Sequence, residues 1–148
     1  MAFFHVEGPA LNQAFKKSAS IAIANGSVLG FDGTNGYVEQ AETASTRIAG
    51  VSLRKVASTD DDYASNTTIP VVVPGPEDIF EADVQSGQTA AQSYVGGQYD
   101  LSTNSDGTAQ TIDLTGVVYK VVTVVGFISA SKVLVKFNGN YVFANKAN

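Results

Sequence analysis

The side chains that could do chemistry in this chain are few, and they lie far apart in the sequence. There is no cysteine, and the only histidine, His5, stands near the start beside Phe3 and Phe4. A catalytic triad or a histidine metal site would depend on that one residue, whose apolar neighbours favour a packing or solvent-facing role. No G-x-S-x-G nucleophile elbow, phosphate loop or dinucleotide fingerprint is present.

Acidic side chains form three small groups that could supply the paired carboxylates of a glycoside hydrolase. These groups are Asp60–Asp62, Glu77 with Asp78, and Glu81 with Asp83. Solvated loops explain the first two groups, and a wet strand face explains the third. Oxygen-rich turns at 32–36 and 104–107 lack the ligand spacing of a helical calcium loop. The sequence therefore predicts no enzyme, no metal site and no cofactor, and a hydrolase that uses the acidic loops is a rival interpretation.

Length and charge narrow the class of protein further. The 148 residues suit one domain, and the net charge of −5 provides no basic patch for nucleic acid. No apolar run reaches the roughly 18 residues of a membrane span, and the N-terminal segment does not resemble a secretory signal. We therefore expect a soluble protein made in the cytosol, without nucleic-acid or membrane partners.

The first 17 residues differ from the rest. Pro9 suits the first turn of a short helix, in which Leu11, Ala14 and Phe15 have helical spacing. Such a segment is too short to be stable alone, so it either folds back on its own domain or reaches another subunit. We expect an N-terminal arm or short helix at 1–17 and a single β domain at 18–148.

Short apolar runs separated by turn residues follow from Ser18 onward, which predicts a compact barrel or sandwich of antiparallel strands. Phe80, Ala82 and Val84 alternate with polar residues, as in a strand with one dry face. Gly50 indicates a bulge or a close backbone approach. Three nearby prolines, the first of them Pro70, predict that 71–73 is an edge strand or a crossover.

The run from Tyr119 to Ile128 is apolar on both faces of the expected strand. A half-solvated antiparallel strand shows only one dry face. Either this strand is sandwiched within its own domain, or its second face meets another protein chain.

Three stretches together resemble the small capsid decoration (cement) proteins of tailed bacteriophages. They are "GSVLGFDGTNGYVEQAETASTRIAGVSL", "FEADVQSGQTAAQSYVGGQYDL" and "VVGFISASKVLVKFN". In that family a short strand, a glycine turn and a second short strand lead into a polar segment, and a strand similar to 48–51 follows. The proline-rich "PVVVPGPEDI" departs from the pattern.

The resemblance implies a non-enzymatic virion protein, made in the host cytoplasm, that sits on the outer capsid surface. It would act as a homotrimer that stabilises the shell by bridging major capsid subunits. We expect an arm that contacts the capsid or a neighbour through Phe3, Phe4, Leu11 and Phe15, and a subunit interface at Val122, Val124 and Ile128. The alternatives are a carbohydrate-binding or host-adhesion module, with tyrosines such as Tyr94 and Tyr99 as stacking rings, or a tail or fibre component.

Overall fold

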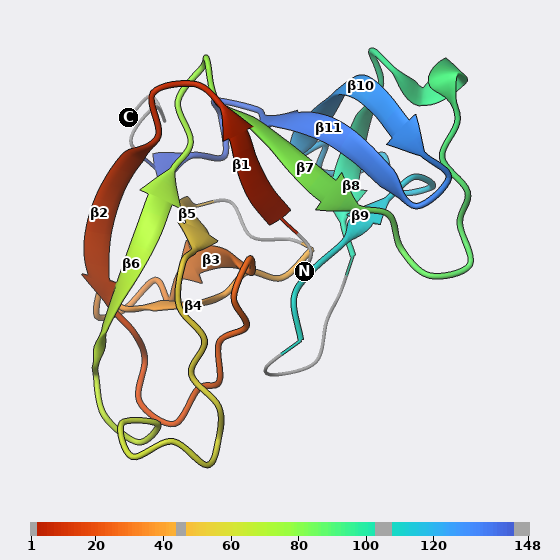
Figure 1. The fold of residues 1–148 in the computed structure, drawn as a ribbon. Helices are drawn as coiled ribbons and strands as arrows, with labels where there is room; N and C mark the ends of the chain where they lie inside the picture. Colours follow the sequence, from red (N-terminus) through yellow and green to blue (C-terminus); the bar gives the residue numbers. More distant parts are fainter. Residues whose placement is uncertain (1–2, 44–46, 103–107, 144–148) are drawn as a thin grey trace.

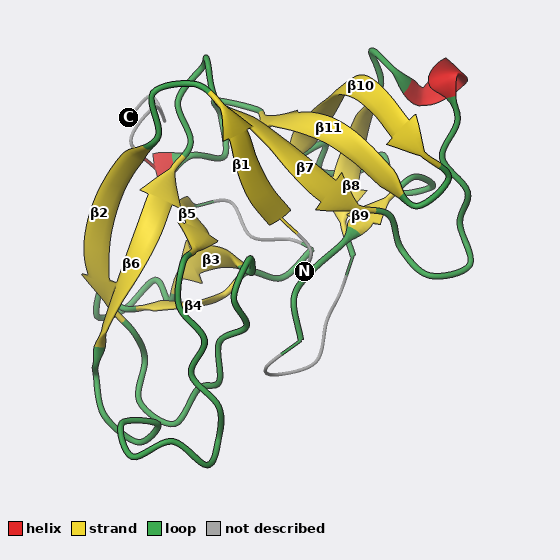
Figure 2. Ribbon diagram, in the orientation of Figure 1, coloured by secondary structure: helices red, strands yellow, loops and turns green. Residues whose placement is uncertain are grey.

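The computed structural model describes residues 3–43, 47–102 and 108–143, and its strands form two antiparallel sheets (Figure 1, Figure 2). The six-stranded sheet contains, in spatial order, β1 Phe3–Glu7, β7 Ile79–Asp83, β11 Lys132–Phe137, β10 Val122–Ser129, β8 Gln98–Leu101 and β9 Ile112–Asp113. The five-stranded sheet contains β2 Leu11–Lys16, β6 Thr68–Val73, β5 Ile48–Ser52, β3 Val28–Phe31 and β4 Val38–Gln40. A short 3-10 helix, η1 Gln92–Tyr94, precedes β8. The predicted all-β fold is confirmed as a sandwich-like pair of sheets, and the barrel alternative is not.

The short helix expected near the N-terminus is wrong, because residues 3–16 form an edge strand in each sheet. β1 pairs with β7, and β2 pairs with β6 over six consecutive residue pairs, from Leu11–Val73 to Lys16–Thr68. An isolated helix of this length is marginal, whereas antiparallel pairing with β6 gives alternate residues of β2 backbone hydrogen bonds. The segment therefore folds back on its own domain, which was one of the two possibilities left open.

Hydrophobic side chains cover both faces of the five-stranded sheet. Val51 and Val72 pack in the core shared with the six-stranded sheet, whereas Ala49 and Val71 pack in a second cluster on the opposite face. Successive strand residues point to opposite faces, so both faces need apolar residues. The loop residue Ile23 closes the second cluster. β5 and β6 lie between these two apolar clusters, which explains why their sequences contain continuous apolar runs.

The links from β1 to β2 and from β6 to β7 both carry the chain from one sheet to the other at the top of Figure 1. Asp78, in the second link, accepts a hydrogen bond from the first. Its side chain is buried. Oδ1 accepts hydrogen bonds from the Ala10 N–H (3.1 Å) and from His5 Nε2 (3.0 Å), and Oδ2 accepts one from the Gly75 N–H (2.7 Å). The carboxylate therefore fixes both sheet-to-sheet links through backbone donors that would otherwise lack partners.

This arrangement predicts a loss of stability in acid. Burial alone raises the pKa of Asp78, but the hydrogen bonds from Gly75, Ala10 and His5 outweigh it and hold the pKa below the ordinary value of 3.8. A group whose pKa is lower in the folded state stabilises the fold above its unfolded pKa, and that contribution disappears as pH falls through the folded pKa. Urea denaturation from neutral pH to below pH ~4 should show this loss in the natural protein.

The variant Asp78→Asn should be about 2 kcal/mol less stable at neutral pH, because its amide cannot accept every one of these hydrogen bonds. Below pH ~4 the difference between the two proteins should narrow, since the natural side chain then also loses its charge. If the stability difference between the variant and the natural protein were the same at neutral and acidic pH, the role assigned to the Asp78 carboxylate would be contradicted.

A second buried polar side chain, Gln110, joins the segment before β9 to the edge of the five-stranded sheet. Its Oε1 accepts hydrogen bonds from the Val28 N–H and the Ser27 hydroxyl, both at 2.9 Å. Its Nε2 donates to the carbonyls of Val28 (2.8 Å) and Ala41 (2.5 Å). The amide thus forms four hydrogen bonds with two segments, Ser27 and Val28 at the start of β3 and Ala41 after β4, and it satisfies buried backbone groups of both.

Candidate functional site

The four residues expected to anchor an arm are split between the core and the surface. Phe3 is buried, with its ring centroid 5.5 Å from that of Phe137, so its predicted role as a surface anchor is corrected. Phe15 is half-buried and packs edge-to-face against Phe31 at 5.4 Å. Phe4 and Leu11 are 54% and 61% exposed. These last two therefore present apolar surface at the sheet edges, and their contact with a capsid or neighbour stays a prediction.

The residues expected at a subunit interface are also divided, because β10 is irregular. Val122 and Val124 are fully buried within this chain and offer no surface to a neighbour, so their placement at an interface is corrected. Register shifts in the β10–β11 pairing leave Val125 and Ile128 as extra residues, and both are exposed. A bulge breaks the alternation of a strand, which moves Ile128 away from the face that Val122 and Val124 share.

The β10–β11 hairpin consequently carries apolar side chains at its surface, because Val125 and Ile128 are exposed and Leu134 is half-buried. Leu134 lies over Gly126, where an added Cβ would stand 2.9 Å from Leu134 Cδ1. Leu134 pairs with Glu81 of β7, and beside this pair Lys132 Nζ contacts Asp83 Oδ1 at 2.8 Å and Glu81 Oε1 at 3.4 Å. The apolar second face that the sequence indicated in this region is therefore present at the surface, with partly different residues.

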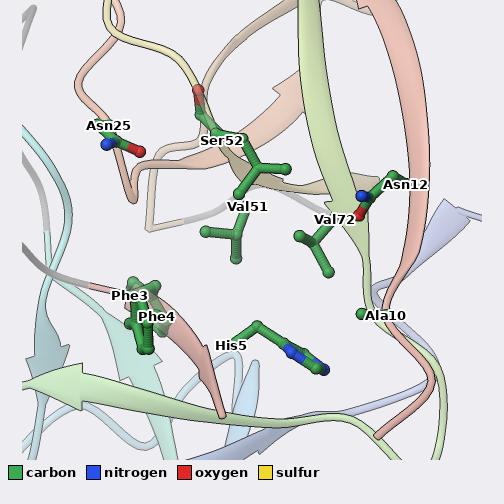
Figure 3. A pocket seen from close by; sticks show the side chains of 10 residues that line it. Phe3, Phe4, His5, Ala10, Asn12, Asn25, Val51, Ser52 and Val72 are labelled. Atoms are coloured by element: carbon green, nitrogen blue, oxygen red, sulfur yellow. The ribbon is translucent and has the colours of Figure 1, made fainter. Parts of the chain in front are cut away.

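A groove opens between the edge of β1 and the five-stranded sheet (Figure 3). We call it the β1 groove. It has a volume of about 340 Å³, near the lower end of the roughly 300–1,000 Å³ typical of binding sites. The residues that line it are Phe3, Phe4, His5, Ala10, Asn12, Asn25, Val51, Ser52, Leu53 and Val72. In Figure 3, Val51 and Val72 point across the opening toward β1.

The lining of the β1 groove is mainly apolar. It contains no Asp, Glu, Lys or Arg, and its one ionisable side chain, His5, is already bonded to Asp78. Leu53, which is 47% exposed, is a wall residue that the sequence did not single out. Such a lining suits apolar side chains of a protein partner better than a charged small molecule.

The acidic side chains considered as possible catalytic pairs form hydrogen bonds and ion pairs that stabilise turns and strands. Asp62 is bonded to the Arg54 guanidinium, and Asp60 Oδ2 accepts a hydrogen bond from the Ala57 N–H at 2.8 Å. Asp78 joins the two sheet links, while Glu81 and Asp83 flank Lys132 on the outer face. In the described ranges, no group of three or more His, Cys, Asp or Glu side chains is placed to hold a metal ion.

Two further features complete the comparison with the sequence. Tyr94 and Tyr99 are half-buried and pack against each other, with ring centroids 5.8 Å apart. Within the part of the chain that the structure describes, no helix combines the length and apolar character that a membrane crossing requires.

Comparisons with known proteins identify no relative of this chain. No protein-family model matches it, and no significant match is found among curated proteins or solved structures.

Proposed function

We propose that this chain is a structural protein of a tailed-bacteriophage virion, which binds the outer capsid surface as a homotrimer and bridges major capsid subunits. The observation that carries the proposal is grouped apolar surface. Nine large hydrophobic side chains of the described residues are more than a third exposed. Two of them, Phe4 and Leu53, line the β1 groove, and three others belong to β10. Single exposed apolar residues are ordinary, but grouped ones are typical of surfaces that contact protein.

The element order supports the resemblance on which the proposal rests. Over 28–52 the chain forms the short strands β3 and β4, then a polar segment, and then β5. The turn between β3 and β4 is held by Asp32, whose Oδ1 accepts hydrogen bonds from the backbone of Thr34, Asn35 and Gly36. This is the order of strand, glycine turn, strand, polar segment and strand that characterises the decoration proteins.

Adhesion of this kind stabilises a shell by mass action. A subunit that binds the assembled shell and not its separate parts adds RT ln(1 + [L]/Kd), about 2.7 kcal/mol at one hundred times Kd. A trimer that engages several capsid subunits makes its later contacts at high effective concentration. Stable interfaces bury on the order of 1,200–2,000 Å² in total, and aromatic anchors dominate their energy. Phe4 is the exposed aromatic side chain of the predicted arm.

Binding to capsids that lack the chain tests the proposal. Because β1 and β2 belong to the two sheets, deletion of the N-terminal residues would disrupt the fold, and point substitutions are needed. The double variant Phe4→Asp with Leu11→Asp should bind at least tenfold more weakly, a change of about 1.4 kcal/mol. Gln13→Asp, an exposed position on β2, should bind like the natural chain. Failure of the natural chain to bind capsids of its own phage would overturn the proposed function.

A further inference from the structure

A polar hollow lies where the segment that joins β9 to β10 meets the turn after β11. We call it the Lys120 hollow. Its volume is about 540 Å³, within the roughly 300–1,000 Å³ that is typical of ligand sites. Its lining is mainly polar, whereas that of the β1 groove is mainly apolar. The lining includes Gln98 of β8, Asn140 of the turn, and Val118, Tyr119 and Lys120 of the joining segment.

A buried carboxylate holds one wall of the Lys120 hollow in place. Asp100, on β8, is 3% exposed and accepts hydrogen bonds from the N–H groups of Val118 (3.2 Å), Tyr119 (2.8 Å) and Lys120 (2.7 Å). From the other side, Asn138 Nδ2 donates to the Lys120 carbonyl at 2.5 Å. The wall is therefore ordered before a ligand arrives, and binding pays little for ordering it.

Lys120 has a backbone conformation that is uncommon outside glycine. Its φ of +56° lies in the left-handed region. The hydrogen bonds to its N–H and its carbonyl hold it there, and the residue is exposed. Residues held in such conformations cluster at ligand sites, where the surrounding structure fixes the backbone from which the side chain projects. The same bonds that order the wall therefore also place the lysine.

The lining of the Lys120 hollow is cationic in a protein that is acidic overall. The net charge is −5, but none of the residues that line the hollow is Asp or Glu, and Lys120 is the charged one. The carboxylate of Asp100 lies behind the wall, where three N–H groups occupy it. The Lys120 ammonium group forms no ion pair within the described ranges. The hollow therefore attracts an anion that an acidic protein otherwise repels.

The groups beside Lys120 suit a ligand that carries hydroxyl groups. An amide both donates and accepts hydrogen bonds, as a hydroxyl does. The Gln98 amide makes one long contact, 3.5 Å, to Thr123, and Asn140 is exposed, so both have capacity for a ligand. Val118, which is 77% exposed, adds apolar surface of the kind that the C–H groups of a sugar ring contact.

We propose that the Lys120 hollow binds an acidic sugar, such as a hexuronic acid unit of a glycan. The sugar carboxylate pairs with the Lys120 ammonium through a charge-assisted hydrogen bond, and the ring hydroxyls pair with the amides of Gln98 and Asn140. A simple anion would leave the amides unused, and a neutral sugar would leave the lysine unused. This binding is additional to the capsid adhesion of the proposed function and does not depend on it.

The size of the Lys120 hollow favours a sugar over an acidic protein segment. A stable protein interface buries on the order of 1,200–2,000 Å², which is far more than one such hollow supplies. One or two sugar rings, in contrast, fit the volume of a small ligand site. The glycan unit is therefore the occupant to which the proposal commits, and an acidic peptide is an alternative that the test must reject.

Titration of the full chain with methyl β-D-glucuronide, followed by NMR, tests the proposal. The backbone amide signals of 117–120 and 138–141 should shift together, with a Kd on the order of 1 mM. Methyl β-D-glucoside, which lacks the carboxylate, should bind at least about tenfold more weakly. Sodium acetate and inorganic phosphate, which lack the sugar ring, should also bind at least about tenfold more weakly.

Two lysine variants form a matched pair for this titration. Lys120→Gln should weaken glucuronide binding at least about tenfold. It should fold normally, because the hydrogen bonds at this position involve the backbone, and circular dichroism checks this. Lys136→Gln removes the same charge from an adjoining hollow, which shares Asn138 and Gly139 with the first, and should bind like the natural chain.

Four results would overturn the inference. Signals that do not shift at about ten times the expected Kd would mean that the hollow binds no acidic sugar. Equal binding of acetate or phosphate would reveal an anion site without sugar recognition, and tighter binding of a polyglutamate peptide would point to a protein partner. Equal losses in Lys120→Gln and Lys136→Gln would reflect overall charge. Capsid binding is measured separately, so either proposal can fail while the other stands.

Discussion

The variant Gly50→Ala should lose most or all of its folding free energy. Gly50 lies in β5, between β3 and β6, and its φ of +151° is one that side chains rarely adopt. An added Cβ would stand 2.1 Å from the Val72 carbonyl oxygen and 2.6 Å from Val71 Cγ1. The backbone of a central strand cannot move aside without breaking its pairing, so a loss above about 4 kcal/mol is expected. Total stabilities are roughly 5–15 kcal/mol, and urea denaturation measures the change.

A matched glycine separates the two causes of this loss. Gly87 also has a positive φ, +88°, but no atom lies within 4 Å of its would-be Cβ. Gly87→Ala should therefore show only the conformational cost, about 1–2 kcal/mol. Equal losses at the two positions would mean that the close approach of Gly50 to β6 contributes nothing.

The second large effect is expected at Gln110. In Gln110→Leu the volume is nearly conserved, but the Val28 N–H, the Ser27 hydroxyl proton and the Ala41 carbonyl lose the hydrogen bonds they make with Gln110. The Val28 carbonyl still accepts the Ala41 N–H at 2.8 Å. An unsatisfied buried polar group costs about 1–3 kcal/mol, so three such groups predict a loss of at least about 3 kcal/mol. Thermal or urea unfolding would report it as a much lower midpoint.

Gln98→Leu is the control for this substitution. Gln98 is exposed on β8, and its amide makes one long contact, 3.5 Å, to Thr123. Its loss should change stability by no more than about 0.5 kcal/mol. If Gln110→Leu is equally mild, water reaches the groups around Gln110 and the amide is not a structural link.

The features that the sequence predicted well are those with a local physical cause. The alternation of Phe80 and Ala82 with Glu81 and Asp83 does place the first pair in the core and the second on the outer face. Gly50 lies beside a register shift between β3 and β5 and directly against β6, as a glycine within an apolar strand indicates. In both cases the residue pattern that allows the prediction lies within a single strand.

The incorrect predictions concern segments whose structure depends on residues far away in the sequence. Leu11 and Phe15 have helical spacing, but the partner that makes them a strand is β6, more than fifty residues later. Pro70 was expected to keep its strand at an edge or crossover, yet β6 lies between β2 and β5. The Pro70 carbonyl accepts the Leu53 N–H, beyond the last residue of β5, so the N–H that proline lacks would also have pointed past the end of that strand.

The candidate surfaces were predicted only in part for the same reason. A bulge cannot be read from the apolar run of β10, so Val124 and Ile128 were assigned to one face. The exposed Val117 and Val118 lie in a segment held by Asp100, which comes nearly twenty residues earlier and looks like an ordinary acidic strand residue in the sequence. The glycine directly before two valines, at 116–118, was the one local signal in the sequence.

The pairing order of the six-stranded sheet has a consequence for synthesis on the ribosome. β1 pairs with β7, but β7 is completed on its other side only by β11, the last of the described strands to be made. At roughly 5–20 residues per second, many seconds pass between synthesis of the phenylalanines at the start of the nascent chain and synthesis of the strand that completes their sheet. During translation the chain is therefore at its most vulnerable to wrong partners, and crowding of several nascent copies on one messenger RNA would raise that hazard.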